Sequence, residues 1–337
     1  MRATFLNPGN PFAIEDVEKK AISNNDILLR VESCAICGSD LKIARFGNSR
    51  IDTKRTIGHE ISGIIEEIGS NVKGYNIGEK VSIGADLPCN QCELCLNGDA
   101  NKCETNFAIG YQFDGGFAEY VILNQHILNE GPIQKFNNAS FDLACLAEPL
   151  ACAINGVEKS LSCYQNKNIN SILIFGGGPM GILLAEYLAF LGNEDIYIAE
   201  PQEFRSNFIR EHTTFKPYHE SQSDIKFDLI FTACPVVETH ISAINLIAKS
   251  GVINFFGGLP QGSQKVDLNT NHIHYNEIVL TGSHGSAPRH HKEAMRIIEE
   301  NFIDLEYLIT HKFKLEQINQ AFDLAYSGMA QKIIINP

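Results

Sequence analysis

The sequence predicts an α/β protein with two domains, one of them built on a doubly wound parallel sheet. The chain has 337 residues, which is more than one ordinary hydrophobic core accommodates. A glycine-rich turn between two apolar runs begins near residue 172, as in a parallel βαβ unit. The segment before it holds short strand-like runs and four closely spaced cysteines, which indicates a different kind of domain.

The first part of the chain is expected to contain short strands, among them residues 26–31 and 61–68. Residues 89–103 read CNQCELCLNGDANKC, and their Asn, Asp and Gly residues are typical of turns. We therefore expect this cysteine lobe to form neither a helix nor a strand.

The second part of the chain predicts strands that alternate with helices. The expected strands are residues 172–175, 196–199, 227–232, 251–256, 277–281 and, at the end of the chain, 332–337. The expected helices include residues 238–248, 290–301 and 315–327. Between residues 205 and 227 there is little room for a full strand and a further helix, so the crossover helix there is expected to be short or missing.

The composition excludes several classes of partner. The net charge of −13 disfavours binding to nucleic-acid phosphates. No apolar run reaches the roughly 18–20 residues of a membrane span, and the N-terminal residues lack the apolar core of a signal peptide. These features predict a cytoplasmic protein with no membrane or nucleic-acid partner.

The four cysteines of the lobe are spaced for metal binding. Gaps of two, two and seven residues let four thiolates converge on one tetrahedral ion, and zinc is the natural occupant. The four are Cys89, Cys92, Cys95 and Cys103. Four sulfur ligands leave no position for water or substrate, so this zinc is expected to be structural.

A second set of residues predicts an open metal site. Cys37 lies in SCAICGSDLK, His59 lies in TIGHEISG, and Glu148 precedes a proline in LAEPLA. One thiolate, one imidazole and one carboxylate leave a fourth position for water or an alcohol oxygen, which is the arrangement of a catalytic zinc. Each residue alone is weak support, and the prediction depends on all three occurring together with the cysteine lobe.

The glycine-rich turn predicts a dinucleotide site. Gly176, Gly178 and Gly181 follow a buried strand and open a helix, with Pro179 and Met180 between them. The glycines permit the tight turn, the close approach of a pyrophosphate, and the packing of the helix on the strand. The helix N-terminus then faces the phosphates.

The next strand ends at Glu200, a position suited to hydrogen bonding with ribose hydroxyls. A carboxylate there repels a 2′-phosphate, so NAD is favoured over NADP. Arg205 is close enough to modify this preference.

The order of these motifs resembles the zinc-dependent medium-chain dehydrogenase/reductase (alcohol dehydrogenase) family along essentially the whole chain. The sequence is most similar to the polyol (sorbitol-type) and threonine dehydrogenase branches. The resemblance implies a GroES-like, partly open β-barrel catalytic domain at residues 1–150 and 286–337, with a Rossmann NAD-binding domain inserted at 151–285. It also implies a homodimer or homotetramer that pairs through the apolar edge strand at 277–281.

The resemblance further implies roles for the residues of the open site. Cys37, His59 and Glu148 would bind the catalytic zinc, so that each chain holds two zinc ions. Glu60 would lie beside the catalytic ion and either replace a ligand or exchange with the water. Asp40 would orient His59 through the second ring nitrogen.

Ser39 would hydrogen-bond the substrate hydroxyl and begin the removal of its proton. The family often has a histidine relay five residues after the ligand cysteine, and this chain has Lys42 there. A protonated lysine is a poor proton acceptor at neutral pH, which leaves the route beyond Ser39 open.

The predicted function is reversible oxidation of a secondary alcohol by hydride transfer to NAD, with a polyol, sugar alcohol or sugar-derived substrate. Arg45, Arg50, Lys54 and Arg55 form a basic cluster between the first two zinc motifs, and the substrate would be phosphorylated or acidic if two of them face the site. Otherwise they form a solvated basic loop. The chain has no tryptophan, so the aromatic candidates for a sugar face are Phe46, Tyr111 and Phe113.

Three other interpretations compete with this function. One is oxidation of an amino alcohol, as in threonine dehydrogenase, which the lysine at position 42 weakens. Another is a catalytically inactive NAD-binding regulatory protein, which the full set of expected zinc ligands disfavours. The last is a nucleic-acid-binding zinc module, which the acidic net charge disfavours.

Overall fold

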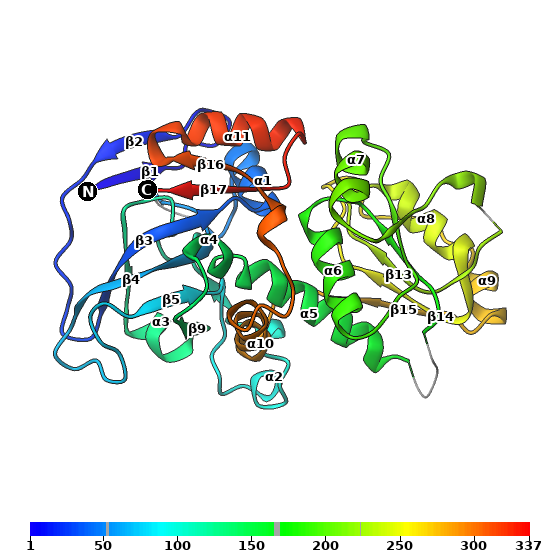
Figure 1. Cartoon of the computed structure of the whole chain (residues 1–337). Coiled ribbons are helices and arrows are strands. Elements are labelled where there is room, and N and C mark those ends of the chain that lie inside the picture. The colour runs from blue at the N-terminus through cyan, green and yellow to red at the C-terminus, as the bar shows by residue number, and fades with distance from the viewer. Residues whose placement is uncertain (52–53, 165–168, 223) are drawn as a thin grey trace. The chain divides into compact units, whose positions relative to one another are not determined.

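The computed structural model describes residues 1–51, 54–164, 169–222 and 224–337. The chain forms two compact units, Met1–Ala151 with Gly285–Pro337, and Cys152–His284 (Figure 1). It therefore leaves the first unit once and returns to it. Within the described residues, no helix combines the length and the apolar character that a bilayer crossing requires.

The main sheet of the first unit is largely antiparallel and follows the order β16-β17-β3-β4-β5-β9, with β8 also paired to β3. Its strands are β3 (Ile27–Ala35), β4 (Glu60–Ile68), β5 (Lys80–Ile83), β8 (Tyr120–Leu123), β9 (Ile133–Phe136), β16 (Ile309–Lys314) and β17 (Lys332–Asn336). β17 pairs with β3, so the last residues of the chain lie beside a strand from its first part (Figure 1). The three strands predicted in this unit are confirmed, although β3 runs on to Ala35 because its end pairs with the start of β4.

Smaller elements complete the first unit. Two short antiparallel pairs are β1 (Arg2–Phe5) with β2 (Ala13–Asp16), and β6 (Asp86–Leu87) with β7 (Phe107–Ala108). The helices are α1 (Gly38–Phe46), α2 (Glu93–Leu96), α3 (Gln125–Glu130), α4 (Phe141–Ala144), α10 (Pro288–Glu299) and α11 (Ile318–Ser327), with 3-10 turns η1 (Ala100–Lys102), η3 (Glu306–Leu308) and η4 (Leu315–Gln317). α5 (Ala147–Ser162) begins in this unit and continues into the second. The two helices predicted near the end of the chain are confirmed as α10 and α11.

The core of the first unit follows from the alternation of side chains along its strands. Ile27, Leu29 and Val31 of β3 are buried on one face, as expected for a strand whose alternate residues point the same way. Ile61 and Ile65 of β4 join the same apolar cluster. This packing fixes the register between β3 and β4, since a slip by one residue would turn the apolar side chains outward.

The second unit contains one sheet in the order β12-β11-β10-β13-β14-β15, with every neighbouring pair parallel. Its strands are β10 (Ile172–Phe175), β11 (Ile196–Ala199), β12 (Lys216–Pro217), β13 (Phe227–Thr232), β14 (Ile247–Phe255) and β15 (Val279–Gly282). The chain order reverses between β10 and β13, which is the doubly wound arrangement that the sequence predicts.

The connections of the second unit confirm one prediction and correct another. After α6 (Pro179–Phe190) and the helix α7 (Glu203–His212), β12 has two residues, and the described part of its connection to β13 holds the 3-10 turn η2 (Glu220–Gln222). The predicted shortening of this crossover is therefore confirmed. The helix predicted at 238–248 is α8 (Val237–Leu246), and it ends early because Ile247 pairs with Phe227 and starts β14. A short helix, α9 (Thr270–Tyr275), precedes β15.

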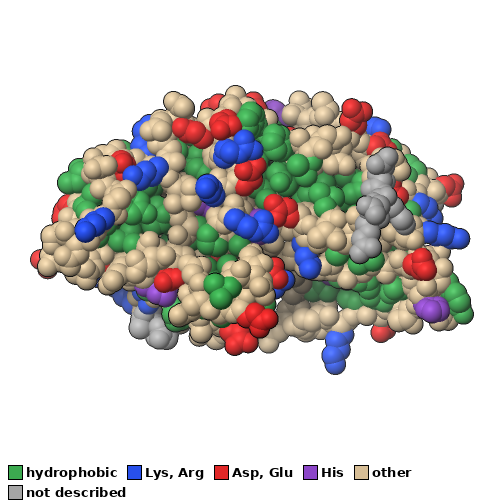
Figure 2. Space-filling model, turned by 90° about the horizontal axis from the view of Figure 1, so that it is seen from below, with side chains coloured by type: hydrophobic (Ala, Val, Ile, Leu, Met, Phe, Trp, Pro, Cys, Tyr) green, Lys and Arg blue, Asp and Glu red, His purple; other side chains and the backbone are tan. Residues whose placement is uncertain are grey.

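Charged side chains of both signs are interspersed on the face of the molecule drawn in Figure 2. Acidic side chains gather at several places on this face, and the basic ones stand among them and among neutral side chains. Such a mixed surface differs from the continuous basic stripe by which proteins bind a nucleic-acid backbone.

Candidate active site and metal centres

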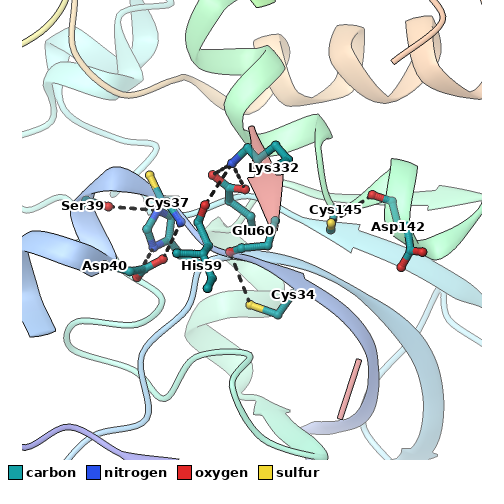
Figure 3. A network of polar contacts seen from close by, with 11 residues as sticks. Cys34, Cys37, Ser39, Asp40, His59, Glu60, Asp142, Cys145 and Lys332 are labelled. Carbon is teal, nitrogen blue, oxygen red and sulfur yellow. Dashed lines mark hydrogen bonds and ion pairs between the residues drawn. The ribbon is translucent and has the colours of Figure 1, made fainter. Parts of the chain in front are cut away.

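Two residues of the predicted open site, Cys37 and His59, lie together with Glu60 where the end of β3 pairs with the start of β4 (Figure 3). Cys37 stands immediately before α1, and His59 and Glu60 stand at the start of β4. Ala35 pairs with Glu60, which brings the two segments together. The ligand atoms of Cys37, His59 and Glu60 lie within 4.8 Å of one another.

Asp40 contacts both Cys37 and His59. One of its oxygens accepts a hydrogen bond of 2.9 Å from the backbone N–H of Cys37. The other lies 3.3 Å from Nδ1 of His59, at ion-pair distance but without the alignment of a hydrogen bond. Burial lowers the pKa of His59, but Asp40 and Cys37 together outweigh burial and hold that pKa well above its usual value. The second ring nitrogen, Nε2, faces Oγ of Ser39 at 3.4 Å.

Lys332, the first residue of β17, is a member of the site that our sequence analysis missed. Its Nζ lies 2.5 Å from Oε1 of Glu60 and also donates to the other carboxylate oxygen, while the carbonyl oxygen of Ile36 is 3.4 Å away (Figure 3). Burial lowers the pKa of Lys332, but Glu60 together with Cys37 and Glu148 outweighs burial and leaves that pKa raised. A signal was present in the sequence, because a lysine opens the apolar run KIIIN.

Glu148 is buried in the first turn of α5, and it is not a member of the three-residue group of ligand atoms found among the described residues. Burial raises its pKa to about 7, with contributions from Glu60 and Asp86, while His59 and Lys332 oppose the rise. These charges place Glu148 in the electrostatic surroundings of the site. Its role as a zinc ligand stays a prediction.

The group formed by Cys37, His59 and Glu60 fits a zinc ion. Thiolate, imidazole and carboxylate are the donors that zinc takes in proteins. Bond lengths of about 2.0–2.3 Å in a tetrahedral site put ligand atoms roughly 3–4 Å apart, which the group's 4.8 Å limit accommodates. With three protein ligands the ion would keep an open position, as a catalytic zinc does.

The four cysteines of the lobe also converge as predicted. The sulfur of Cys92 lies 3.4 Å from that of Cys95 and 3.9 Å from that of Cys103, and Cys89 and Cys95 are 3.9 Å apart. Backbone N–H groups of the turn, those of Gln91 and Cys92, lower the pKa of Cys89 to about 6, whereas burial raises the pKa of Cys95 to about 12. Four sulfurs at these distances fit a closed, structural zinc site.

The prediction that the lobe contains no helix is wrong. The short helix α2 starts directly after Cys92, and the 3-10 turn η1 ends directly before Cys103. A single helical turn between Cys92 and Cys95 brings both sulfurs to the same side, because residues three apart are neighbours on a helix.

The glycine-rich turn has the geometry that the sequence predicts. Gly176 has φ +103°, a left-handed conformation that L side chains rarely adopt. A Cβ on Gly181 would lie 1.9 Å from the carbonyl oxygen of Gly176, so only glycine permits this approach. Gly178 caps α6, and Pro179 and Met180 form the first positions of that helix.

Glu200 and Arg205 both border this turn. The two carboxylate oxygens of Glu200 accept hydrogen bonds from the backbone N–H groups of Gly177, at 2.8 Å, and Gln202, at 2.9 Å. A Cβ atom on Gly178 would lie 3.6 Å from the guanidinium of Arg205, so this side chain is next to the turn. An acidic and a basic side chain thus stand together beside the turn.

Comparisons with known proteins agree with this architecture. Residues 23–132 match the alcohol dehydrogenase GroES-like domain, and residues 141–333, more than half of the chain, match the glucose dehydrogenase C-terminus. L-threonine 3-dehydrogenase of Shewanella woodyi is 25% identical over 345 residues, covering 98% of each chain.

Solved structures share the fold. A protein of Sinorhizobium meliloti described as a zinc-binding dehydrogenase, solved with NADP, is 24% identical with a TM-score of 0.89, covering 100% of this chain and 99% of that one. Galactitol-1-phosphate dehydrogenase of Escherichia coli is 22% identical with a TM-score of 0.85, covering 100% of both chains. The chain belongs to the zinc-dependent medium-chain dehydrogenase/reductase family, which contains the zinc-type alcohol and polyol dehydrogenases.

Proposed function

We propose that this chain catalyses the reversible oxidation of a secondary alcohol in a polyol or sugar-derived substrate to the ketone, with zinc and a nicotinamide dinucleotide. The observation that carries the proposal is the group formed by Cys37, His59 and Glu60, with Ser39 beside it. A zinc ion bound there would polarise the substrate hydroxyl and lower its pKa.

The side chains around this group have separate tasks in the proposed reaction. Ser39 accepts the proton of the substrate hydroxyl, since its own hydroxyl lies 3.4 Å from Nε2 of His59, the ring nitrogen that is not paired with Asp40. Asp40 fixes the orientation of His59 and Cys37. Lys42 lies on the exposed side of α1, and a protonated ammonium has no acceptor for the proton, so the proton leaves Ser39 by another route.

The cofactor would bind at the glycine-rich turn, with its pyrophosphate at the N-terminus of α6. Glu200 favours NAD, because its carboxylate repels a 2′-phosphate. Arg205 next to it offers a positive charge, and the Sinorhizobium meliloti relative was solved with NADP. We propose NAD as the preferred cofactor and NADP as a weaker one.

The ligand variants Cys37→Ala and His59→Ala test the proposal. We expect each to lose one of two zinc ions and to oxidise alcohols about 1,000-fold more slowly or worse, because the metal supplies several kcal/mol of transition-state stabilisation. Cys163→Ala is the matched control, since this cysteine lies in the second unit outside both zinc groups. Full alcohol oxidation by Cys37→Ala with that zinc absent would refute the mechanism.

Oxidation of an amino alcohol is the second candidate, because L-threonine 3-dehydrogenases are among the curated relatives at 25–26% identity. A panel containing L-threonine, neutral polyols, polyol phosphates and sugar acids separates the two candidates by NADH formation. Preference for L-threonine would replace the polyol proposal and leave the zinc chemistry intact.

We also propose that the chain forms a homodimer or homotetramer. Its support is β15, the edge strand of the parallel sheet, which can pair with a second copy across a two-fold axis. Light scattering of the purified protein measures the mass, and a monomer at micromolar concentration would refute the proposal.

A further inference from the structure

The basic cluster between the first two zinc motifs separates into residues with different surroundings. Lys54 forms an ion pair of 2.6 Å with Glu15, and Arg55 one of 3.3 Å with Asp114. Their charges are therefore balanced within the chain. Arg45 and Arg50 lie over aromatic rings, as Lys54 does over Phe5, but among the described residues they form no ion pair.

Arg50 is held in place by neutral groups. Its Nη2 donates to the carbonyl oxygen of Asn106 at 2.9 Å and to Oε1 of Gln112 at 3.3 Å. Among the described residues, no carboxylate lies within ion-pair distance of its guanidinium. Because Nη2 makes both contacts, the N–H groups on Nε and Nη1 are available to another acceptor. The side chain is thus an oriented cation whose charge no other described residue balances.

One aromatic ring connects Arg50 to the zinc group. The Arg50 guanidinium lies over the ring of Tyr111, 4.8 Å from its centre. The Tyr111 ring in turn lies 6.2 Å from the imidazole of His59, centre to centre. Burial raises the pKa of Tyr111, and the charges of His59 and Asp40 and the side chain of Ser39 also act on its hydroxyl. The Tyr111 ring therefore lies beside both the His59 imidazole and the Arg50 guanidinium.

We propose that Arg50 determines specificity by binding an anionic group, a carboxylate or a phosphate ester, on the substrate whose hydroxyl is oxidised at the Cys37 group. This inference rests on the proposed alcohol oxidation and adds the substrate class. Arginine suits the role because a fixed guanidinium forms charge-assisted hydrogen bonds with oxyanions. The substrate would extend along the Tyr111 ring from the hydroxyl to the anion.

Arg45 provides the matched control. It comes from the same segment and also contacts aromatic rings, with its guanidinium 5.8 Å from the ring centres of Phe46 and Tyr326. Those rings are not part of the zinc group. A loss of positive charge at position 45 therefore changes the net charge as much as a loss at position 50, without touching Tyr111.

The experiment compares the wild-type holoenzyme with Arg50→Gln, Arg50→Lys and Arg45→Gln. Each is assayed on matched sets of four- to six-carbon polyols, the corresponding sugar acids and the polyol phosphates. For Arg50→Gln we expect KM for anionic substrates to rise about 10–100-fold with kcat little changed, because charge-assisted binding is lost equally from substrate and transition state. KM for neutral polyols stays within about twofold, Arg50→Lys restores part of the loss, and Arg45→Gln behaves as wild type.

Binding of the same anionic compounds, measured by calorimetry without turnover, should weaken in Arg50→Gln by the same factor. The sugar acids and the phosphates separate the two kinds of anion. Equal changes for neutral and anionic substrates, or a wild type that oxidises neutral polyols with no preference for anions, would overturn the inference while the proposed function stands. A wild type with bound zinc that oxidises no alcohol of the panel would overturn both.

Discussion

Replacing Lys332 by methionine removes the one positive charge that donates hydrogen bonds to Glu60 in the described part of the site. The side chains of Lys332 and Glu60 are 3% and 0% exposed, so water cannot take over the role of the ammonium. Methionine is unbranched and of similar length, so the packing around position 332 is largely kept. Without a bound metal ion, Glu60 then carries an uncompensated charge in the core, and breaking a buried pair in this way costs about 3–5 kcal/mol.

Unfolding in urea and by heat measures this cost. For a unit of roughly 200 residues, about 3–5 kcal/mol corresponds to a lowering of Tm by roughly 6–20 °C. The double variant Glu60→Gln with Lys332→Met removes both charges, and we expect it to recover a large part of the loss. Zinc content is measured in parallel, because loss of a bound ion would lower the unfolding free energy separately.

Lys312→Met is the control for this experiment. Lys312 also forms an ion pair, 2.6 Å from Asp142, but its side chain is 54% exposed. Exposed pairs contribute about 0–1 kcal/mol, so this variant should lose little. If Lys332→Met, measured after removal of the metal, lost no more than Lys312→Met treated in the same way, the argument that burial makes the Glu60 pair costly to break would be refuted.

Three further predictions concern other parts of the chain. Cys103→Ser should reduce the zinc content from two ions per chain to one while alcohol oxidation persists, and loss of both ions by elemental analysis would contradict independent sites. Glu200→Ala should raise KM for NAD about tenfold and improve NADP relative to NAD, whereas an unchanged cofactor ratio would remove Glu200 from the cofactor site. Burial lowers the pKa of His291 to about 4. Since the unfolded histidine has a pKa near 6.5, only the unfolded state binds this proton between about pH 6.5 and 4, and the unfolding free energy falls by up to about 3 kcal/mol as the pH drops through that window. The variant His291→Asn should flatten this slope in urea titrations, and an unaltered slope would show that other groups cause it.

The features that the sequence predicts well are local ones. The strands at 172–175, 196–199 and 227–232 have the predicted bounds, because each is a short apolar run that ends where the flanking residues interrupt the apolar pattern. The sequence also predicts the cysteine lobe, because its four cysteines lie within fifteen residues. It does not predict the helix α2 inside the lobe, because four residues are too few to show a helical period.

The features that the sequence does not predict depend on contacts between distant segments. Lys332 and Glu60 are 272 residues apart in the sequence, and the residues next to each of them do not indicate that the two side chains meet. Arg50 and Lys54 belong to the same basic cluster of the sequence, and only the fold shows that one contacts Tyr111 and the other Glu15. The start of β14 was misplaced for the same reason, because the pairing of Ile247 with a distant strand decided it.

The register of one strand connects the stability of the fold to the proposed chemistry. β3 pairs on one side with β4, where Ala35 faces Glu60, and on the other with β17, where Ala35 faces Ile334. Residues two apart on a strand point to the same face, so this register sets the face on which Lys332 meets Glu60. A slip by one residue on either side would move the lysine or the glutamate to the opposite face of the sheet. The buried apolar side chains of β3 that prevent such a slip therefore also keep Lys332 next to Glu60 and the rest of the proposed zinc site.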